Sequence, residues 1–201
     1  LSWYNGQMDK IKVVPGQPVT FSGTAQTATD QEVLIYGGSN IKKITGISTM
    51  NPNELILGYA TRLTELIATD CPLLTTINSN KANLSAHTYL NKVDLSGCSQ
   101  LGGILQLHNS PLIQDVNMKG TAITGLQMPT SLRNLSVLKL PNTINTLTLM
   151  DVPLLHTLEF DEGTSMQSVS LSNCSSLENC INFDLTKTPT VILDNSYDTE
   201  E

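Results

Sequence analysis

The sequence contains few aromatic residues, since Phe, Trp and Tyr together make up only 4% of its 201 residues. Aromatic rings usually supply a large share of buried area, so a core built from this chain has to be filled by other side chains. Hydrophobic residues of all kinds reach 39%, which is enough for one sizeable core. We therefore expect Leu, Ile, Val and Met to pack against one another in an aliphatic interior.

Clustered positive charge is also missing. The chain has 11 Lys and Arg residues against 18 Asp and Glu, a net charge of -7, and its longest basic run is Lys42-Lys43. A protein that binds nucleic acid neutralises phosphates with grouped Lys and Arg side chains. The charge pattern therefore predicts no nucleic-acid partner.

Long apolar runs are absent as well. No run approaches the 18 residues that a membrane-spanning helix needs, so we expect no insertion into a membrane. The segment from Leu1 to Gly6 has neither the charged start nor the apolar stretch of a signal peptide. We expect the chain to be a segment of a longer polypeptide.

Arrangements of residues that carry out catalysis are not visible either. His87, His108 and His156 fall in different parts of the pattern described below, without a Ser or Cys placed to form a nucleophile-base pair. We expect each of them to be a solvated surface residue. The acidic pairs, such as Asp161-Glu162, lack the spacing of a calcium loop. The sequence predicts no enzyme, no metal site and no cofactor.

The chain does contain a repeat, which dominates residues 90 to 180. Each unit reads apolar-x-x-apolar-x-apolar, followed by a short polar turn. Eight consecutive units match, with the central apolar residues Val93, Leu105, Val116, Leu126, Leu138, Leu147, Leu158 and Val169. Successive centres lie 9 to 12 residues apart, and every second centre lies 20 to 23 apart. Two units therefore form one coil, of a length that leucine-rich coils commonly have.

The alternation within each unit predicts a short strand that buries one side only. Strands near residues 93, 116, 138, 158 and 181 should stack into one parallel sheet, and strands near 105, 126, 147, 169 and 191 into a second. The predicted fold is mainly β, a leucine-rich-repeat-like right-handed β-solenoid with two parallel sheets and an N-terminal β cap. We place the cap at residues 1–33, the solenoid at 34–195 with regular repeats at about 63–182, and an acidic tail at 196–201. Leu55–Leu57 is predicted as a strand, with a helical turn over 52–66 as the alternative.

The repeat resembles bacterial leucine-rich repeats of about 21 to 23 residues, such as those of Bacteroidales surface proteins and internalin-like adhesins. The segments 97–104, 119–126 and 140–149 are also similar to parts of leucine-rich virion proteins of gut phages that infect those bacteria. This resemblance implies a structural or host-contacting domain of a phage tail or fibre, located in the virion. The alternative that it implies is an adhesin domain on a bacterial cell surface.

The four cysteines fit a reduced, structural role. Cys71, Cys98 and Cys174 occupy the turn after a strand, where leucine-rich repeats place Asn or Cys. Cys180 follows Cys174 at a spacing that is a poor match for a metal site. We expect buried free thiols that pack as small hydrophobic residues.

The outward residues of the two predicted sheets differ in charge. The sheet with the strand near 93 presents a mixture of acidic and basic residues, whereas the other presents short hydroxyl and amide side chains. Candidate binding residues on this second, uncharged side are Gln106, His108, Gln127, Thr146, Thr148, Ser168 and Ser170. Such a surface suits packing against another virion protein, a host surface or a second copy of the chain. Sugar binding usually adds an aromatic platform, which is lacking here.

One insertion interrupts the pattern between Asn78 and Leu90. Insertions between the coils of a solenoid often carry contacts, so this segment is a candidate contact loop. Its candidate contact residues are Asn80, Lys81, His87 and Tyr89. The alternative is an excursion of the chain without a binding role.

Overall fold

The computed structural model describes residues 32–34, 41–49, 52–58, 60–188 and 190–194. The predicted cap and acidic tail lie outside these residues, apart from the strand β1. On one side of the molecule lie β2 (Lys43–Ile44), β4 (Glu65–Ile67), β6 (Lys92–Asp94), β8 (Asp115–Asn117), β10 (Val137–Leu140), β12 (Thr157–Phe160) and β14 (Asn179–Ile181). On the other lie β1 (Glu32–Leu34), β3 (Glu54–Ile56), β5 (Thr76–Ile77), β7 (Gly102–Gln106), β9 (Ala122–Gln127), β11 (Thr146–Met150), β13 (Ser168–Ser172) and β15 (Thr190–Asp194). Two short 3-10 turns, η2 (Ile47–Thr49) and η3 (Leu185–Lys187), complete the elements.

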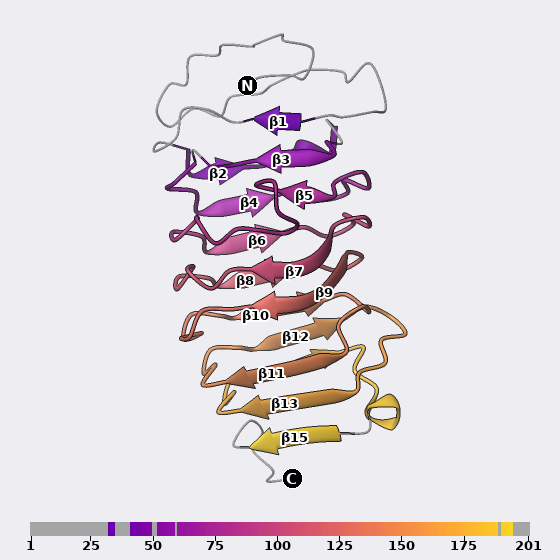
Figure 1. The fold of residues 1–201 in the computed structure, drawn as a ribbon. Helices are drawn as coiled ribbons and strands as arrows, with labels where there is room; N and C mark the ends of the chain where they lie inside the picture. Colours follow the sequence, from indigo (N-terminus) through magenta and orange to yellow (C-terminus); the bar gives the residue numbers. More distant parts are fainter. Residues whose placement is uncertain (1–31, 35–40, 50–51, 59, 189, 195–201) are drawn as a thin grey trace.

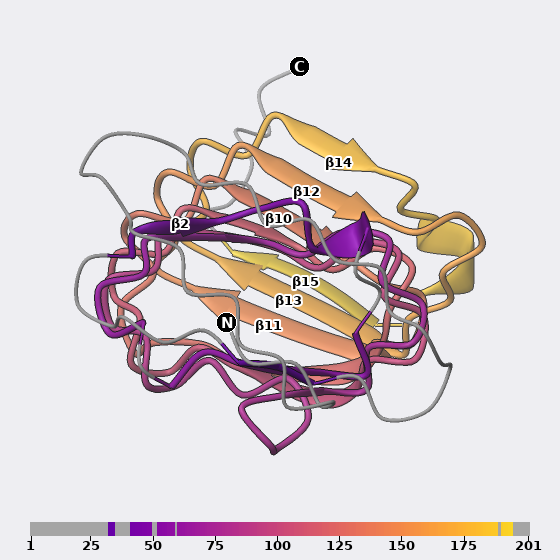
Figure 2. The ribbon, with the colours of Figure 1, turned by 90° about the horizontal axis from the view of Figure 1, so that it is seen from above.

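The chain forms a parallel β-solenoid of about seven turns with coils of about 22 residues. Each strand pairs in parallel with the strand one coil away, as shown by Val93 opposite Val116 and Val116 opposite Leu138. The coils stack along one axis in Figure 1, and the view along that axis in Figure 2 shows the two sides facing each other. The predicted coil length and parallel stacking are confirmed, and β3 confirms the strand predicted near Leu55.

The interior is the aliphatic ladder that the composition predicted. Val93, Val116, Leu138 and Leu158 form one fully buried column, and Leu residues fill most other inward positions. Burying one such side chain contributes roughly 1.5–3 kcal/mol. Phe160 is the largest fully buried side chain, and its ring stacks on that of Phe183 with centroids 5.3 Å apart.

Tight turns after the strands allow the coils to stack closely. Asp70, Gly97 and Gly120 occupy equivalent places in successive coils and all have positive φ angles, of 53°, 77° and 69°. Gly97 needs glycine for its backbone angle, and a Cβ atom there would also crowd Asp70, whose Cα would lie 3.2 Å away.

The cysteine prediction is confirmed for the three turn positions. Cys71, Cys98 and Cys174 are buried and none of the four cysteines is in a disulfide. The thiol of Cys98 donates a hydrogen bond to the carbonyl of Ala68 at 2.9 Å. Cys180 is partly buried, and burial raises the pKa of its thiol to about 11.

The second side was predicted as one continuous sheet, and this prediction is wrong. The seven strands β2 to β14 of the first side form one sheet, but the second side divides into β1-β3-β5, β7-β9 and β11-β13-β15. Between β7 and β9 the register shifts, because β9 has one extra residue, Thr124. Such a bulge bends a strand and increases its twist, and β9 is the strand that fails to pair with β11.

Candidate contact surface

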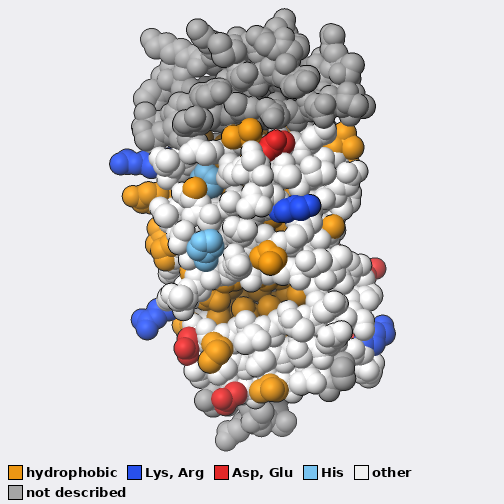
Figure 3. All heavy atoms as spheres, in the orientation of Figure 1, with side chains coloured by type: hydrophobic (Ala, Val, Ile, Leu, Met, Phe, Trp, Pro, Cys, Tyr) orange, Lys and Arg blue, Asp and Glu red, His pale blue; other side chains and the backbone are white. Residues whose placement is uncertain are grey.

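The predicted binding residues lie together on the second side of the solenoid. His108, Gln127, Thr146 and Thr148 are exposed, and the remaining ones, Gln106, Ser168 and Ser170, are partly exposed. Strands β7, β9, β11 and β13 contain no Asp, Glu, Lys or Arg. These four strands therefore present an uncharged surface, and in the lower half of Figure 3 the red and blue side chains lie toward the edges of the face.

Two exposed apolar side chains belong to the same uncharged surface and were missed by the sequence analysis. Ile104 on β7 is 44% exposed and Met150 on β11 is 63% exposed. Both are outward residues of their strands, and the repeat pattern alone identifies only the inward positions. They could have been found by assigning inward and outward positions along the whole of each strand and not only around its apolar centre.

The charged residues of the first side are paired with one another. Lys43, Glu65, Lys92 and Asp115 stand opposite each other in successive coils, so that charge alternates along the column. Lys43 contacts Glu65 at 2.6 Å, and Lys92 contacts Asp115 at 2.5 Å. Opposite charges on neighbouring strands stabilise the pairing of a sheet.

A second group of ion pairs is centred on Glu159. Its carboxylate accepts hydrogen bonds from Lys119 at 2.5 Å and from Lys139 at 2.8 Å. These two lysines hold the pKa of Glu159 below its usual value. The charges on this side thus act between coils, which leaves few of them for a partner.

The candidate contact loop needs a correction at His87, which was expected on the surface. The side chain is fully buried. Its Nδ1 lies 3.2 Å from the carbonyl of Ala60, and its Nε2 lies 3.2 Å from Nδ2 of Asn78. A carbonyl can only accept, so Nδ1 carries the proton and Nε2 accepts from the amide. Burial lowers the pKa of this histidine.

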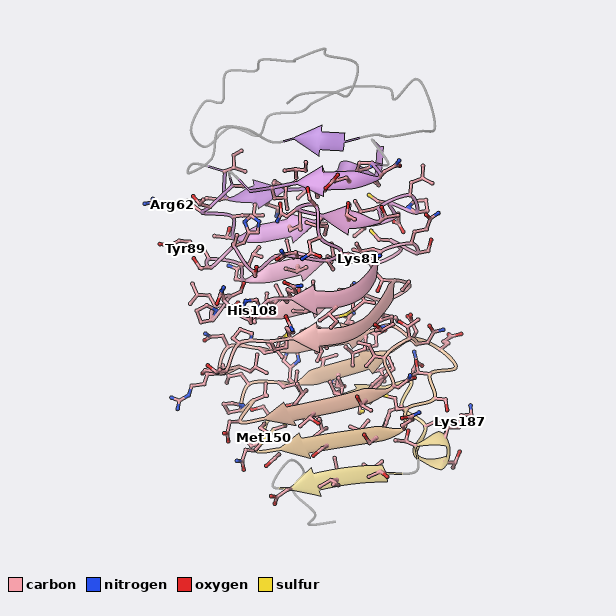
Figure 4. All side chains as sticks on the ribbon, viewed as in Figure 1. Arg62, Lys81, Tyr89, His108, Met150 and Lys187 are labelled. Carbon is pink, nitrogen blue, oxygen red and sulfur yellow. The ribbon has the colours of Figure 1, made fainter. Side chains whose placement is uncertain are left out.

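The rest of the insertion is also tied into the fold. Asn78 accepts from the backbone N–H of Leu57 at 2.6 Å and donates to the carbonyl of Asn83 at 2.9 Å. Residues 81–84 form parallel bridges with β5 on one side and β7 on the other. The exposed members of the predicted loop are Asn80, Lys81 and Tyr89. In Figure 4, Tyr89 projects from one edge of the solenoid, away from Lys81, so the predicted loop residues do not form one site.

A groove opens in the uncharged surface where β9 and β11 fail to pair. Its volume is about 460 Å³, and its lining is Thr124, Gly125, Leu126, Met128, Pro129, Thr130, Leu132, Ile144, Thr146, Leu147, Thr148, Leu149 and Met150. Figure 3 shows the apolar floor of this groove in the middle of the face. Leu126 is only partly buried, although its stacked counterpart Leu105 is completely buried. The missing strand pair has therefore left part of the core accessible.

Among the described residues, no group of three or more His, Cys, Asp or Glu side chains is arranged to hold a metal ion. The same part of the chain has no helix of the length and apolar character that crossing a membrane would require.

The fold defines the chain as a parallel β-solenoid, and four of its strands, β7, β9, β11 and β13, form an uncharged surface. No protein-family model, curated protein or solved structure matches the sequence.

Proposed function

We propose that this chain is a non-enzymatic interaction domain of a larger protein, and that it binds its partner through the uncharged surface of β7, β9, β11 and β13. The observation that carries the proposal is the difference between the two sides. The ion pairs of the first side join neighbouring coils, whereas β7, β9, β11 and β13 of the second side contain no charged residue.

The physical reason is the cost of removing side chains from water. The buried centres of protein interfaces are depleted in charged residues, because an ion that loses its hydration needs a closely matched partner. Hydroxyl and amide groups lose less hydration free energy on burial than ions do. Hydrogen bonds across an interface readily satisfy them. Exposed Ile104 and Met150 add apolar area to the same surface. Contact through this side therefore gives a more favourable binding free energy than contact through the ion-paired side.

The parent protein that we propose is a phage virion component, a tail or fibre protein that contacts other virion proteins, a second copy or the host surface. The alternative is an adhesin domain of a Bacteroidales cell-surface protein. The resemblance of the repeat to leucine-rich repeats supports both parents. In the same proposal the coils are leucine-rich repeats wound in a right-handed sense and covered by a β cap at residues 1–33.

Binding of the labelled chain to purified phage particles and to intact Bacteroidales cells tests the surface. Replacing both Gln106 and Ser170 with Arg places two charges on the uncharged surface outside the groove. We expect the amount of this labelled variant that stays bound to fall at least tenfold. The matched control replaces Gln114 and Asn179, which are exposed beside the first sheet, with Arg and should bind as the natural chain does.

A second experiment distinguishes the two parents. Antibody labelling of particles and cells, viewed by electron microscopy, should decorate the particles if the parent is a virion protein. Label on cells alone would favour the adhesin. Equal loss of binding in the Gln106/Ser170 and Gln114/Asn179 variants would reject the uncharged surface as the contact site.

A further inference from the structure

The groove between β9 and β11 is the one place where neighbouring coils on the described part of the second side have no backbone pairing. In a parallel ladder, alternate residues direct their N–H and C=O groups to opposite neighbours. The N–H of Leu107 donates to the carbonyl of Gln127 at 2.8 Å, so Gln127 faces β7 and Leu126 and Met128 face the groove. The N–H of Asp151 donates to the carbonyl of Ser172 at 3.0 Å, so Leu149 faces β13 together with Asp151.

It follows that the backbone groups of Thr146, Thr148 and Met150 face the groove from the other side. No strand pairing joins β9 to β11 in the described structure. One side-chain bond crosses the gap, from the hydroxyl of Thr143 to the carbonyl of Ile123. Two strand edges thus face each other across an apolar floor, and both have the hydrogen-bonding groups to receive a strand.

The same molecule shows how such a space is filled. Between β5 and β7 the chain inserts its own residues 81–84, which bridge both strands in parallel. Ala82 and Leu84 of this segment are fully buried, and Asn83 between them is partly exposed. The N–H of Leu84 donates to the carbonyl of Gln106 at 3.1 Å, and the carbonyl of Ala82 accepts from the N–H of Gln106 at 3.0 Å. An extended segment with alternate apolar residues therefore fits between two coils of this solenoid.

We propose that the groove between β9 and β11 accepts an extended, uncharged segment of a partner protein, about five or six residues long, which pairs in parallel with both strands. The length follows from the six residues of β9 and the five of β11. The absence of charge follows from the lining, which contains no ionisable residue. A charged side chain in this groove would lose its hydration without a countercharge.

The partner segment has apolar residues at every second position. These side chains occupy the level of the core between Leu126 and Leu147 and complete the burial of Leu126. Strand addition of this kind obtains affinity from backbone hydrogen bonds and specificity from the alternate side chains. The groove volume of about 460 Å³ lies in the range of natural binding sites. This inference deepens the proposed function and rests on it, because it assigns the partner's chemistry to one part of the uncharged surface.

The test uses a labelled peptide with the sequence of residues 168–172, Ser-Val-Ser-Leu-Ser, capped at both ends, because this stretch has the required alternation and no charge. Fluorescence anisotropy with the whole chain should show saturable binding, and hydrogen exchange should slow at Leu126, Met128 and Thr148 but not at Val169. A peptide of the same composition with its apolar residues grouped together should bind at least tenfold more weakly.

A variant of the groove edge provides the second arm. Thr148→Pro removes an N–H that faces the groove and not β13, and proline is tolerated at such strand edges. We expect at least tenfold weaker peptide binding, whereas Thr148→Val keeps the N–H and should bind as the natural chain does. The strand-accepting groove is overturned by no saturable binding up to about 1 mM, by equal binding of the two peptides, or by equal binding of the natural chain and Thr148→Pro. The Gln106 and Ser170 substitutions lie outside the groove, so their result tests the uncharged surface separately.

Discussion

At the scale of single residues, His87 shows how the tertiary structure changes the meaning of a residue. A histidine in a polar insertion is ordinarily solvated, but here it accepts from Asn78 and donates to Ala60 inside the core. Its burial opposes protonation, so the folded chain holds its pKa below the usual 6.5. Below pH 6.5 the unfolded chain therefore binds a proton that the folded chain does not, and the free energy of unfolding falls as the pH is lowered.

We predict that His87→Gln removes part of this pH dependence. At neutral pH the variant should lose about 1–3 kcal/mol, because Ala60 or Asn78 is left with a poorer partner. Between about pH 7.5 and pH 5.5 its stability should change less than that of the natural chain. Urea unfolding at the two pH values measures both effects. His108→Gln, at an exposed position, is the control, and a pH dependence as steep in His87→Gln as in the natural chain would contradict the assignment.

Phe160 tests the packing of the interior. It is fully buried and stacks on Phe183, so Phe160→Ala should cost about 3–5 kcal/mol through lost contacts and the cavity left behind. Leu154→Ala, at a side chain that is 54% exposed, should change stability by less than about 0.5 kcal/mol. Thermal and urea unfolding compare the two variants. Similar losses in both would mean that the aliphatic ladder is not packed as described.

At the scale of elements, the ion pairs connect coils that are far apart in the sequence. Glu159 on β12 joins Lys139 on β10 and Lys119 just after β8, and its pKa is lowered by both. A carboxylate with a lowered pKa stabilises the fold above its ordinary value of 4.5, and this contribution is lost as the pH falls through the lower pKa of the folded chain.

We therefore expect Glu159→Gln to destabilise the chain by about 1 kcal/mol at neutral pH and low salt, since partly exposed ion pairs are weak. The difference from the natural chain should shrink as the pH is lowered below 4.5 and as salt is added. Denaturant titrations at a series of pH values and salt concentrations measure this stability difference. Glu162→Gln, at an exposed acid next to the same strand, should show no such dependence. A constant difference at all pH values would mean that the effect is not electrostatic.

At the scale of the whole molecule, each coil contacts mainly its two neighbours, so stability should vary along the axis. Strands β8 and β10 lie between other coils and have fully buried inward residues, whereas β15 pairs with β13 at the end of the described sheet, and Ile192 and Leu193 are exposed. We predict that amides of β8 and β10 exchange with solvent at least a hundredfold more slowly than those of β15. Hydrogen exchange followed by mass spectrometry measures this, and uniform protection would indicate a single cooperative unit instead.

The sequence by itself determined the coil, because a strand that buries alternate residues has apolar side chains at every second position. The spacing of Val93, Val116 and Leu138 predicted their column, and the turn positions predicted the buried Cys71 and Cys98. The uncharged surface could also be predicted, since the outward residues of a strand are simply those between the inward ones.

Only the tertiary structure decided how the coils meet. The second side is divided at two places: residues 81–84 lie between β5 and β7, and β9, which has one extra residue, does not pair with β11. Both breaks involve backbone groups that the repeat pattern does not describe. The burial of His87 and the insertion of residues 81–84 between β5 and β7 each involve a partner more than 20 residues away, Ala60 for His87 and Gln106 for Asn83. Local alternation specifies which side of a strand faces the core, whereas the pairing between coils is a long-range property of the stacked chain.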